Sequence, residues 1–223
     1  MSAAVLFDLA IGDPTARPDS SMGYKACLNA TDNDFERGSV GAGTGATFGK
    51  LNGIKYCTKG GIGTSCITLR NGVKVGVLVV VNAFGDVIDP QTNIILGGAR
   101  DLDGKYINTY EKLKQGHALT SVFRYTNTTL GIIATNAQIT KEKANRIATL
   151  SHNGLAKVIS PVHTVFDGDA IFVTGRIKSK LQASVDLLGN VAAEAIILAV
   201  IDAIKSATTV AGVPCYINIS NRI

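Results

Sequence analysis

The feature that most constrains the fold is the apolar run VGVLVVVNAFGD at residues 75–86. A half-exposed strand alternates apolar and polar residues, whereas this run is apolar at almost every position. Such a run is typical of a buried strand, and we expect both of its faces to be covered. Asn82 is the polar residue that we expect at the end of this strand.

Other segments predict a sheet with helices packed against it. Asn71–Gly72 predicts a turn between two strands. Thr140 is placed to cap one helix, and a second helix is apolar over most of its circumference, so we expect it to be deeply packed. The order of strand, helix, strand and helix implies one α/β domain. We expect strands at 64–70, 74–86, within 127–137, at 169–175 and at 213–219, helices at 140–159 and 184–207, and a polar surface connection at 87–126.

Composition limits the class of protein. The chain has 223 residues, of which 46% are apolar and 17% charged, and its mean hydropathy is +0.22. These values predict one sizeable domain with a thick core, and they favour a homo-oligomer. The net charge of +5 comes from scattered lysines and arginines, and there is no tryptophan, so we expect no nucleic-acid partner.

The chain shows no sign of a targeting segment or a metal site. Its N-terminus lacks the pattern of a signal peptide, and the apolar stretch 191–204 is short and broken by Glu194 and Asp202. We therefore expect a soluble, cytoplasmic protein with no membrane partner. The cysteines and histidines have no metal-ligand spacing, which predicts buried free thiols, isolated histidines, no metal and no cofactor. These residues are Cys27, Cys57, Cys66, Cys215, His117, His152 and His163.

The glycine-rich stretch GSVGAGTGATFGK at 38–50 raises the question of a phosphate loop. A Walker loop needs four residues between its first glycine and the Gly-Lys pair, but only three separate Gly45 from Gly49. The dinucleotide fingerprint fails too, because Ala46 and Phe48 stand where its third glycine belongs. The alternative is a structural one, in which the glycines allow another backbone to approach closely.

Two short motifs offer candidate catalytic groups. Asn127, Thr128 and Thr129 precede a buried strand, which is ordinary for threonines. A threonine can nevertheless act as a nucleophile without histidine if the bond before it is cut, because its own α-amine, with a pKa of about 8, then serves as the base. Asp167 and Asp169 flank Gly168 before the next strand, either as an ordinary turn or as a carboxylate pair at the same strand end.

These motifs belong to a longer pattern. It resembles the self-cleaving N-terminal-nucleophile aminopeptidases and amidases, which include L-aminopeptidase/D-esterases, β-peptidyl aminopeptidases and 6-aminohexanoate-oligomer (nylon-oligomer) hydrolases. The resemblance is strongest to the nylon-oligomer branch. The matching segments, in family order, are AAVLFDLAIGD (3–13), RPDSSMGYKAC (17–27), GSVGAGTGATFGK (38–50), VGVLVVVNAFGD (75–86), NTTLGIIATNA (127–137) and HTVFDGDAIF (163–172).

The resemblance implies a role for each matching position. It places self-cleavage between Asn127 and Thr128, giving fragments 1–127 and 128–223, with Thr128 as the nucleophile. Asp167 and Asp169 match the acidic pair of the nylon-oligomer branch. The remaining matches are Lys50 and Asn82, which are polar active-site positions, and Tyr24, which lines the substrate site.

The resemblance also implies a fold and an activity. The fold is a four-layer α/β/β/α sandwich, incomplete at the N-terminus, because the N-terminal third of the family has no counterpart here. The activity is hydrolysis of amide bonds in peptides or amino-acid oligomers. Two alternatives remain: an acyl transferase resembling ornithine acetyltransferases, and an inactive truncated homologue that persists as an associating subunit.

Overall fold

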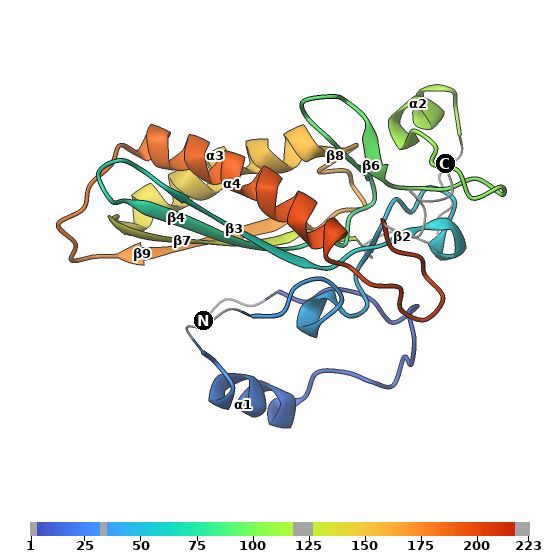
Figure 1. The fold of residues 1–223 in the computed structure, drawn as a ribbon, viewed down its shortest axis with the longest axis horizontal. Helices are drawn as coiled ribbons and strands as arrows, with labels where there is room; N and C mark the ends of the chain where they lie inside the picture. Colours follow the sequence, from blue (N-terminus) through green and yellow to red (C-terminus); the bar gives the residue numbers. More distant parts are fainter. Residues whose placement is uncertain (1–3, 32–34, 118–126, 217–223) are drawn as a thin grey trace.

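A computed structural model describes residues 4–31, 35–117 and 127–216, and it centres on a four-stranded sheet (Figure 1). The strand order is β3-β4-β7-β9, with antiparallel pairing from β3 to β7 and parallel pairing between β7 and β9. The strands are β3 (Ile62–Thr68), β4 (Lys74–Val80), β7 (Leu130–Gln138) and β9 (Ala170–Arg176).

Local sequence signals explain how these elements begin and turn. Gly72 takes a φ of +82° in the tight connection between β3 and β4, as the Asn71–Gly72 pair predicts. The parallel strands β7 and β9 require a crossover, and α3 (Lys141–Val158) supplies it. The Thr140 side chain accepts a hydrogen bond from the Lys143 amide, which confirms the predicted helix cap.

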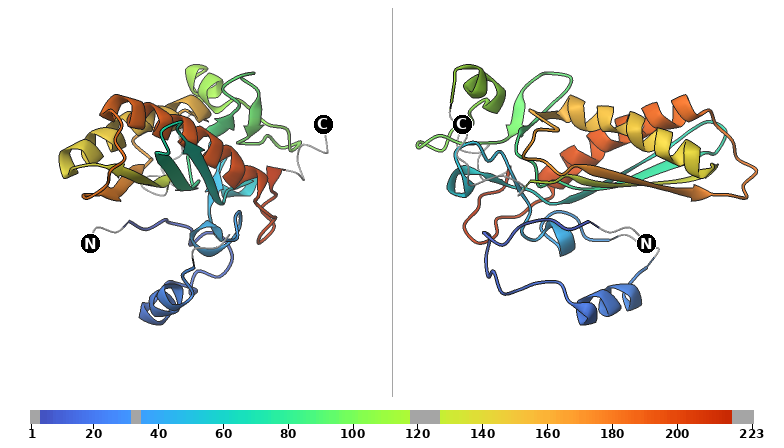
Figure 2. Two further views of the ribbon diagram at one scale, coloured as in Figure 1. Left: turned by 60° about the vertical axis from the view of Figure 1, so that its left-hand side comes forward. Right: turned by 180° about the vertical axis from the view of Figure 1, so that it is seen from behind.

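Two helices cover one face of the sheet. α4 (Val185–Lys205) packs on β3 and β4, and α3 packs beside it toward β9 (Figures 1 and 2). The approach is close, because a side chain at Gly63 of β3 would collide with the α4 backbone. α4 is long and apolar enough to cross a membrane by length and composition, and 61% of its apolar window is buried within this fold.

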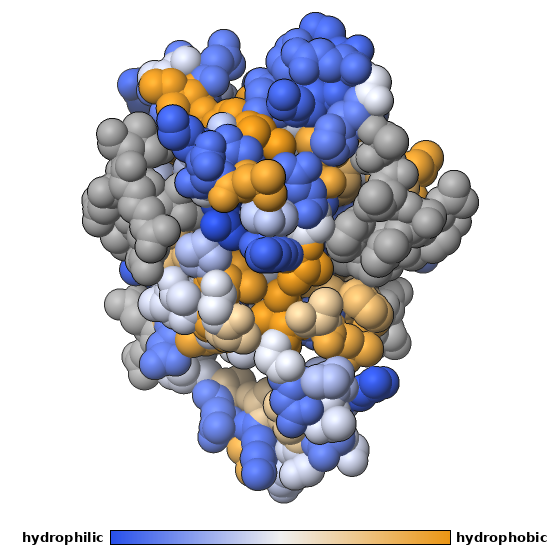
Figure 3. Space-filling model, turned by 90° about the vertical axis from the view of Figure 1, so that its right-hand side faces the viewer, coloured by the Kyte–Doolittle hydropathy of each residue, from blue (hydrophilic) through white to orange (hydrophobic). Residues whose placement is uncertain are grey.

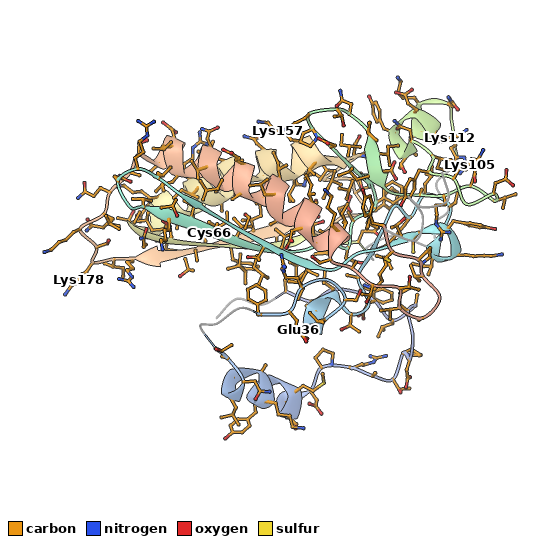
Figure 4. All side chains as sticks on the ribbon, in the orientation of Figure 1. Glu36, Cys66, Lys105, Lys112, Lys157 and Lys178 are labelled. Carbon is orange, nitrogen blue, oxygen red and sulfur yellow. The ribbon has the colours of Figure 1, made fainter. Side chains whose placement is uncertain are left out.

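The opposite face of the sheet is only partly covered. Its side chains include Leu78, which is half-buried, and Ile132, which is 49% exposed. Cys66 on β3 is exposed as well (Figure 4). The first part of the chain, with α1 (Ser20–Leu28), runs on this side (Figure 1). We predicted that both faces of the 75–86 run are covered, and this is confirmed for the face that packs against α3 and α4. Over the opposite face, the described residues supply no further sheet and no helix layer.

Smaller elements gather beyond one end of the main sheet. Seen from that end, hydrophobic surface lies at the centre between hydrophilic regions (Figure 3). A second sheet has the order β6-β5-β8, and β1 pairs with β2. The elements are η1 (Gly41–Gly43), β1 (Thr47–Phe48), η2 (Ile54–Tyr56), β2 (Thr58–Lys59), β5 (Asp86–Ile88), β6 (Ile95–Gly97), α2 (Thr109–Lys114) and β8 (Ile159–Ser160).

Three expectations about the elements need correction. The 74–86 run is not one strand, because β4 ends at Val80 and β5 begins at Asp86. The 87–126 region is not merely a polar connection, since β6 and α2 lie within it; residues 118–126 are outside the described part. The expected final strand at 213–219 is absent from its described residues, where Val213 makes an isolated bridge to Val210 and no strand of the main sheet.

Candidate active site

The candidate site lies at one end of the main sheet, where β4 ends and where β7 and β9 begin. We call this end of the three strands the strand edge. Val80 at the end of β4 pairs with Leu130, and Leu130 pairs with Ala170 at the start of β9. The same pairing continues past the strands: the Thr128 amide donates to Asn82 O at 2.9 Å. The sheet register thus brings together residues 46 apart in the sequence.

Asp167–Gly168–Asp169 joins this edge from the β9 side. The Gly168 amide donates to Asn127 O at 2.8 Å, so the carbonyl of the expected cleavage site accepts a backbone hydrogen bond. Asn127 and Asp167 also form an isolated parallel bridge. A side chain at Gly168 would lie 3.0 Å from the Thr128 hydroxyl, so a glycine here leaves room beside that oxygen.

Thr128 is the more accessible of the two adjacent threonines. It is half-buried, and its Oγ1 lies 2.6 Å from Asn127 O. Thr129 is fully buried, and its hydroxyl has no hydrogen-bond partner among the described residues. Strand alternation gives Thr128 the same side of the sheet as Ile132, away from the helices. The Thr128 hydroxyl can therefore be reached from the partly open face.

Lys50 and Asn82 form a buried polar pair next to Thr128. Lys50 Nζ donates to Asn82 Oδ1 at 2.9 Å, and the Thr47 amide donates to the same oxygen at 3.1 Å. Because Oδ1 receives two donors, the orientation of the amide is fixed and Nδ2 is presented as a donor. Asn82 Nδ2 reaches Phe7 O at 3.4 Å.

The end of the glycine-rich stretch holds Lys50 in place. Gly49 and Lys50 donate backbone hydrogen bonds to Gly85 O and Phe84 O, which fixes this segment beside the residues that follow β4. Gly49 has a φ of +68°, and a side chain there would collide with the backbone of 98–99. Glycine is thus needed at position 49 because another backbone segment lies too close for a side chain, as the structural alternative for this stretch predicts.

Lys50 is a buried cation with a shifted pKa. Its side chain is fully buried, and this burial lowers its pKa from 10.5 to about 8. Cys57, where it is ionised, and the Asp167 carboxylate act in the opposite direction, because negative charge nearby favours the ammonium form. The group remains mostly protonated at neutral pH, where it can steady negative charge in the site.

Asp167 is held by donors from two segments. Its Oδ1 accepts from the Phe84 amide at 3.1 Å, and its Oδ2 accepts from the Thr164 hydroxyl at 2.6 Å and the Thr164 amide at 3.2 Å. Burial raises the pKa of Asp167, and the nearby Asp169 charge adds to that rise, whereas the hydrogen bonds oppose it.

Asp169 is bonded to the backbone that follows Thr128. Its Oδ1 accepts from the Thr129 amide at 2.8 Å, and its Oδ2 lies 2.8 Å from His163 Nδ1. All four oxygens of the two carboxylates, Asp167 and Asp169, therefore have protein partners. This arrangement suits groups that orient the strand end.

One predicted site residue lies apart from the rest. Tyr24 is on α1, a helix with no buried residues, and its side chain is 66% exposed. Among the hydrogen bonds and ring contacts of the described residues, none connects Tyr24 to the strand edge, whereas Lys50, Asn82, Thr128, Asp167 and Asp169 gather there. A substrate-lining role for Tyr24 stays a prediction.

Two features of the site escaped sequence analysis. Two of the three histidines are not isolated: His163 contacts Asp169, and its ring lies edge-on to that of His152, with centroids 4.9 Å apart. Burial and the neighbouring His163 lower the pKa of His152. Lys59 is a second buried lysine, whose Nζ donates to the carbonyls of Gly43, Ala46 and Gly60 at 2.7–2.8 Å. No spacing or motif in the sequence marks either contact.

The thiols and acidic groups give no sign of a metal centre. The four cysteines are free, with Cys57 and Cys215 buried as predicted, but Cys27 and Cys66 exposed. Within residues 4–31, 35–117 and 127–216, no group of three or more histidine, cysteine, aspartate or glutamate side chains could hold a metal ion. The chemistry that the described site offers is therefore that of a hydroxyl, an amide donor, a buried cation and two anchored carboxylates.

Curated relatives resemble nearly the whole chain. It is 38% identical over 233 residues to an uncharacterized aminopeptidase of Mycobacterium tuberculosis, covering 96% of this chain and 65% of that protein. It is 27% identical over 218 residues to a 6-aminohexanoate-oligomer endohydrolase of Kocuria sp., covering 92% and 61%. The chain thus spans less than two thirds of the length of these relatives.

Solved structures and a family model agree with these relatives. A protein from Pyrococcus horikoshii matches 91% of the chain and 54% of its own length, with a TM-score of 0.62 and 23% identity. An L-aminopeptidase D-Ala-esterase/amidase from Ochrobactrum anthropi, described as a new variant of the Ntn-hydrolase fold, matches 84% and 49%, with a TM-score of 0.57 and 16% identity. The model of peptidase family S58 matches residues 3–215. The chain belongs to peptidase family S58.

Proposed function

We propose that this chain carries the active site of an N-terminal-nucleophile amide hydrolase. In this proposal it cleaves itself between Asn127 and Thr128, and Thr128 then attacks amide bonds of peptides or amino-acid oligomers. One observation carries the proposal: hydrogen bonds of 2.8–2.9 Å from backbone amides join the Thr128, Asn82 and Asp167–Asp169 segments at one strand edge.

The proposed self-cleavage needs no group from outside the site except water. The Thr128 Oγ attacks the Asn127 carbonyl carbon, a C–O bond forms, and the C–N bond breaks to release the α-amine of Thr128, whose nitrogen gains the proton that the hydroxyl loses. Water then hydrolyses the ester, which leaves a carboxylate on Asn127 and restores the hydroxyl. The Gly168 amide supports this step, because it already donates to Asn127 O and can stabilise negative charge there.

The same groups take further roles in turnover. The freed α-amine accepts the proton of the Thr128 hydroxyl as this oxygen attacks a substrate carbonyl, and it returns the proton to the leaving amine. Asn82 Nδ2 donates to the oxyanion, while Lys50 holds Oδ1 and so keeps the amide in that orientation. The positive charge of Lys50 also disfavours protonation of the α-amine.

The carboxylates support a positioning role in this scheme. Asp169 holds the Thr129 amide and Asp167 holds the Phe84 amide, so the pair joins both sides of the strand edge. The substrate class follows from the relatives, one named an aminopeptidase and another a 6-aminohexanoate-oligomer endohydrolase. We propose short peptides and amino-acid oligomers as substrates. Acyl transfer and loss of activity remain the alternatives for the experiments to exclude.

We also propose that the partly open sheet face is covered in the active protein. Ile132 and Leu78 lie on that face, and an exposed apolar surface of this kind marks an interaction site. A further β-sheet packed on this face, with helices behind it, would complete a four-layer α/β/β/α sandwich. Association with another copy of the chain would cover part of the same face. Size-exclusion chromatography with light scattering tests the second arrangement: a monomer at micromolar concentration would contradict it.

Intact-mass spectrometry of the purified chain tests self-cleavage. We expect the 23.3 kDa species to disappear over time and two fragments, 1–127 and 128–223, to appear together. Thr128→Ala should abolish the conversion, whereas Thr128→Ser, which keeps a hydroxyl, should retain it. A wild-type chain that stays uncut after prolonged incubation, or a Thr128→Ala chain cut at the same bond, would contradict the proposal.

Substrate assays then separate hydrolase from transferase. The processed protein should release amines from short amide oligomers in a reaction that Thr128→Ala abolishes. Transfer of the acetyl group of N-acetylornithine to an amino acid, without oligomer hydrolysis, would favour the acyl-transferase alternative. Complete processing without either reaction would favour an associating subunit.

A further inference from the structure

His163 forms the outer end of a short hydrogen-bonded chain that reaches the strand edge. Its Nδ1 lies 2.8 Å from Asp169 Oδ2, and Asp169 Oδ1 accepts from the Thr129 amide at 2.8 Å. The Asp169 side chain is only 4% exposed, whereas that of His163 is 37% exposed. Because a carboxylate can only accept here, Nδ1 carries the proton and His163 is the donor.

The backbone at His163 is in an unusual conformation. Its φ is +54°, in the left-handed region that few residues other than glycine adopt. Such a conformation is strained and persists where the surrounding structure requires it. Here it accompanies two side-chain contacts, since the imidazole ring donates to Asp169 and lies edge-on to His152.

Asp167 offers an instructive contrast with Asp169. Asp167 receives three donors from Phe84 and Thr164, so its orientation does not depend on a single group. Among the described residues, Asp169 has one donor on each oxygen, the Thr129 amide on Oδ1 and His163 on Oδ2. Loss of His163 would therefore leave one Asp169 oxygen without its partner and allow the carboxylate to rotate away from the Thr129 amide.

We propose that His163 is a positioning residue for the nucleophile. It holds Asp169 in the orientation that binds the Thr129 amide, and this bond fixes the backbone directly after Thr128. The inference rests on the proposed role of Thr128, and it adds a histidine to the groups that act on that residue. His163 itself has no contact with the Thr128 hydroxyl among the described interactions, so it acts through Asp169.

Two variants separate the hydrogen bond from the backbone conformation. Glycine and asparagine both tolerate a φ near that of His163, but only asparagine offers an N–H at about the position of Nδ1. We would therefore compare wild type, His163→Gly and His163→Asn. His117→Asn serves as the matched control, because His117 is exposed, follows α2 and makes no contact with Asp169 or Thr129 among the described interactions.

Two measurements on the full chain test the proposal. The first is amide hydrogen exchange at Thr129 in a Thr128→Ala background, which keeps the chain uncut. The second is the rate of conversion to fragments 1–127 and 128–223 with Thr128 intact. Loss of a hydrogen bond to a charged group changes an equilibrium constant by about tenfold or more. In His163→Gly we therefore expect the Thr129 amide to exchange about tenfold faster and the chain to convert to fragments about tenfold more slowly. His163→Asn should return both rates to within about threefold of wild type.

The two measurements distinguish failure of this inference from failure of the proposed function. If the wild-type chain never converts, the proposed function fails, and hydrogen exchange alone then decides whether His163 holds the strand edge. Protection lost in His163→Gly and regained in His163→Asn supports the inference. Equal protection in wild type and both variants, or equal impairment in the two variants while His117→Asn is unchanged, overturns it.

Discussion

Lys50 and Lys59 are buried ammonium groups, and we predict that they make the fold more stable as the pH rises above about 8. Burial lowers the pKa of each from 10.5 to about 8. Between these two values the unfolded chain binds more protons than the folded one, so the free energy of unfolding rises with pH. The penalty for burying the charge is fully present below about pH 8 and disappears as pH rises further.

The magnitude follows from the two pKa values. Raising the pH from about 7.5 to about 9 adds about 1.2 kcal/mol per lysine, or about 2.5 kcal/mol for both. Two other groups act in the opposite sense, because burial raises the pKa of Asp86 to about 7 and also raises that of Cys57. Asp86 removes about 0.2 kcal/mol over this window and Cys57 acts in the same direction, which leaves most of the gain from the two lysines.

Urea denaturation at several pH values across this window measures the effect. Lys59→Met should lose about half of the gain, whereas Lys157→Met should keep all of it, since Lys157 is exposed on α3 (Figure 4). Lys59→Met also leaves the Gly60 carbonyl without its ammonium donor, so its stability starts lower and the slope is the quantity to compare. A wild-type stability that stays level or falls between about pH 7.5 and 9 would refute the reasoning.

Three further predictions concern single residues. Asn82→Ala should slow amide hydrolysis by the processed protein about 10²–10³-fold in substrate assays, because an oxyanion donor is lost; a hydrolysis rate within threefold of wild type would exclude that role. Gly49→Ala should lower the free energy of unfolding by about 2 kcal/mol or more in thermal denaturation, because it adds a backbone collision to a φ of +68°. Gly104→Ala, with a φ of +84° but open space, is the matched control and should cost only about 1 kcal/mol; equal losses would contradict the collision. Asp86→Asn should flatten the fall in stability as pH rises from 3.8 to about 7, because folded Asp86 keeps its proton to about 7 and unfolded Asp86 only to 3.8; an unchanged slope in denaturation at pH values across this window would refute that assignment.

The elements that sequence predicted well are those with local signals. Thr140 begins α3 because its side chain satisfies a free amide of the first turn, and Asn71–Gly72 supplies the positive φ that a tight hairpin needs. Both effects act within a few residues, so they are visible in a short window. The apolar run of β4 is also a local signal. The cover over its second face, however, comes from residues far away in the sequence, which the run itself cannot reveal.

The elements that sequence missed depend on partners far along the chain. α2 is tied to the core because Asp86 accepts hydrogen bonds from the amide and hydroxyl of Thr109, 23 residues later. In the sequence, Asp86 closes the apolar run 75–86, and the residues after it predict only a polar surface connection. Burial of that carboxylate becomes visible only when the strands are assembled.

The candidate site also combines features that the sequence predicted with features that only the folded structure shows. The residues alone left Thr128 and the Asp167–Asp169 pair open between ordinary and catalytic interpretations, and a family pattern across six segments was needed to select among them. The sheet register then explains why they meet, since Asn82, Thr128 and Gly168 continue the pairing of adjacent strands. His163 begins the matching segment at 163–172, but the sequence assigned it no role, because its contact with Asp169 becomes visible only in the folded structure.

The position of β7 in the sheet has a consequence for the cut protein. β7 lies between β4, which precedes the Asn127–Thr128 bond, and β9, which follows it. Cleavage there would leave two chains that share one sheet, each contributing two adjacent strands and neither able to complete the core alone. Unfolding would then become dissociation, and recovery after denaturation would follow second-order kinetics that slow on dilution, whereas the uncut precursor would refold at a rate independent of concentration.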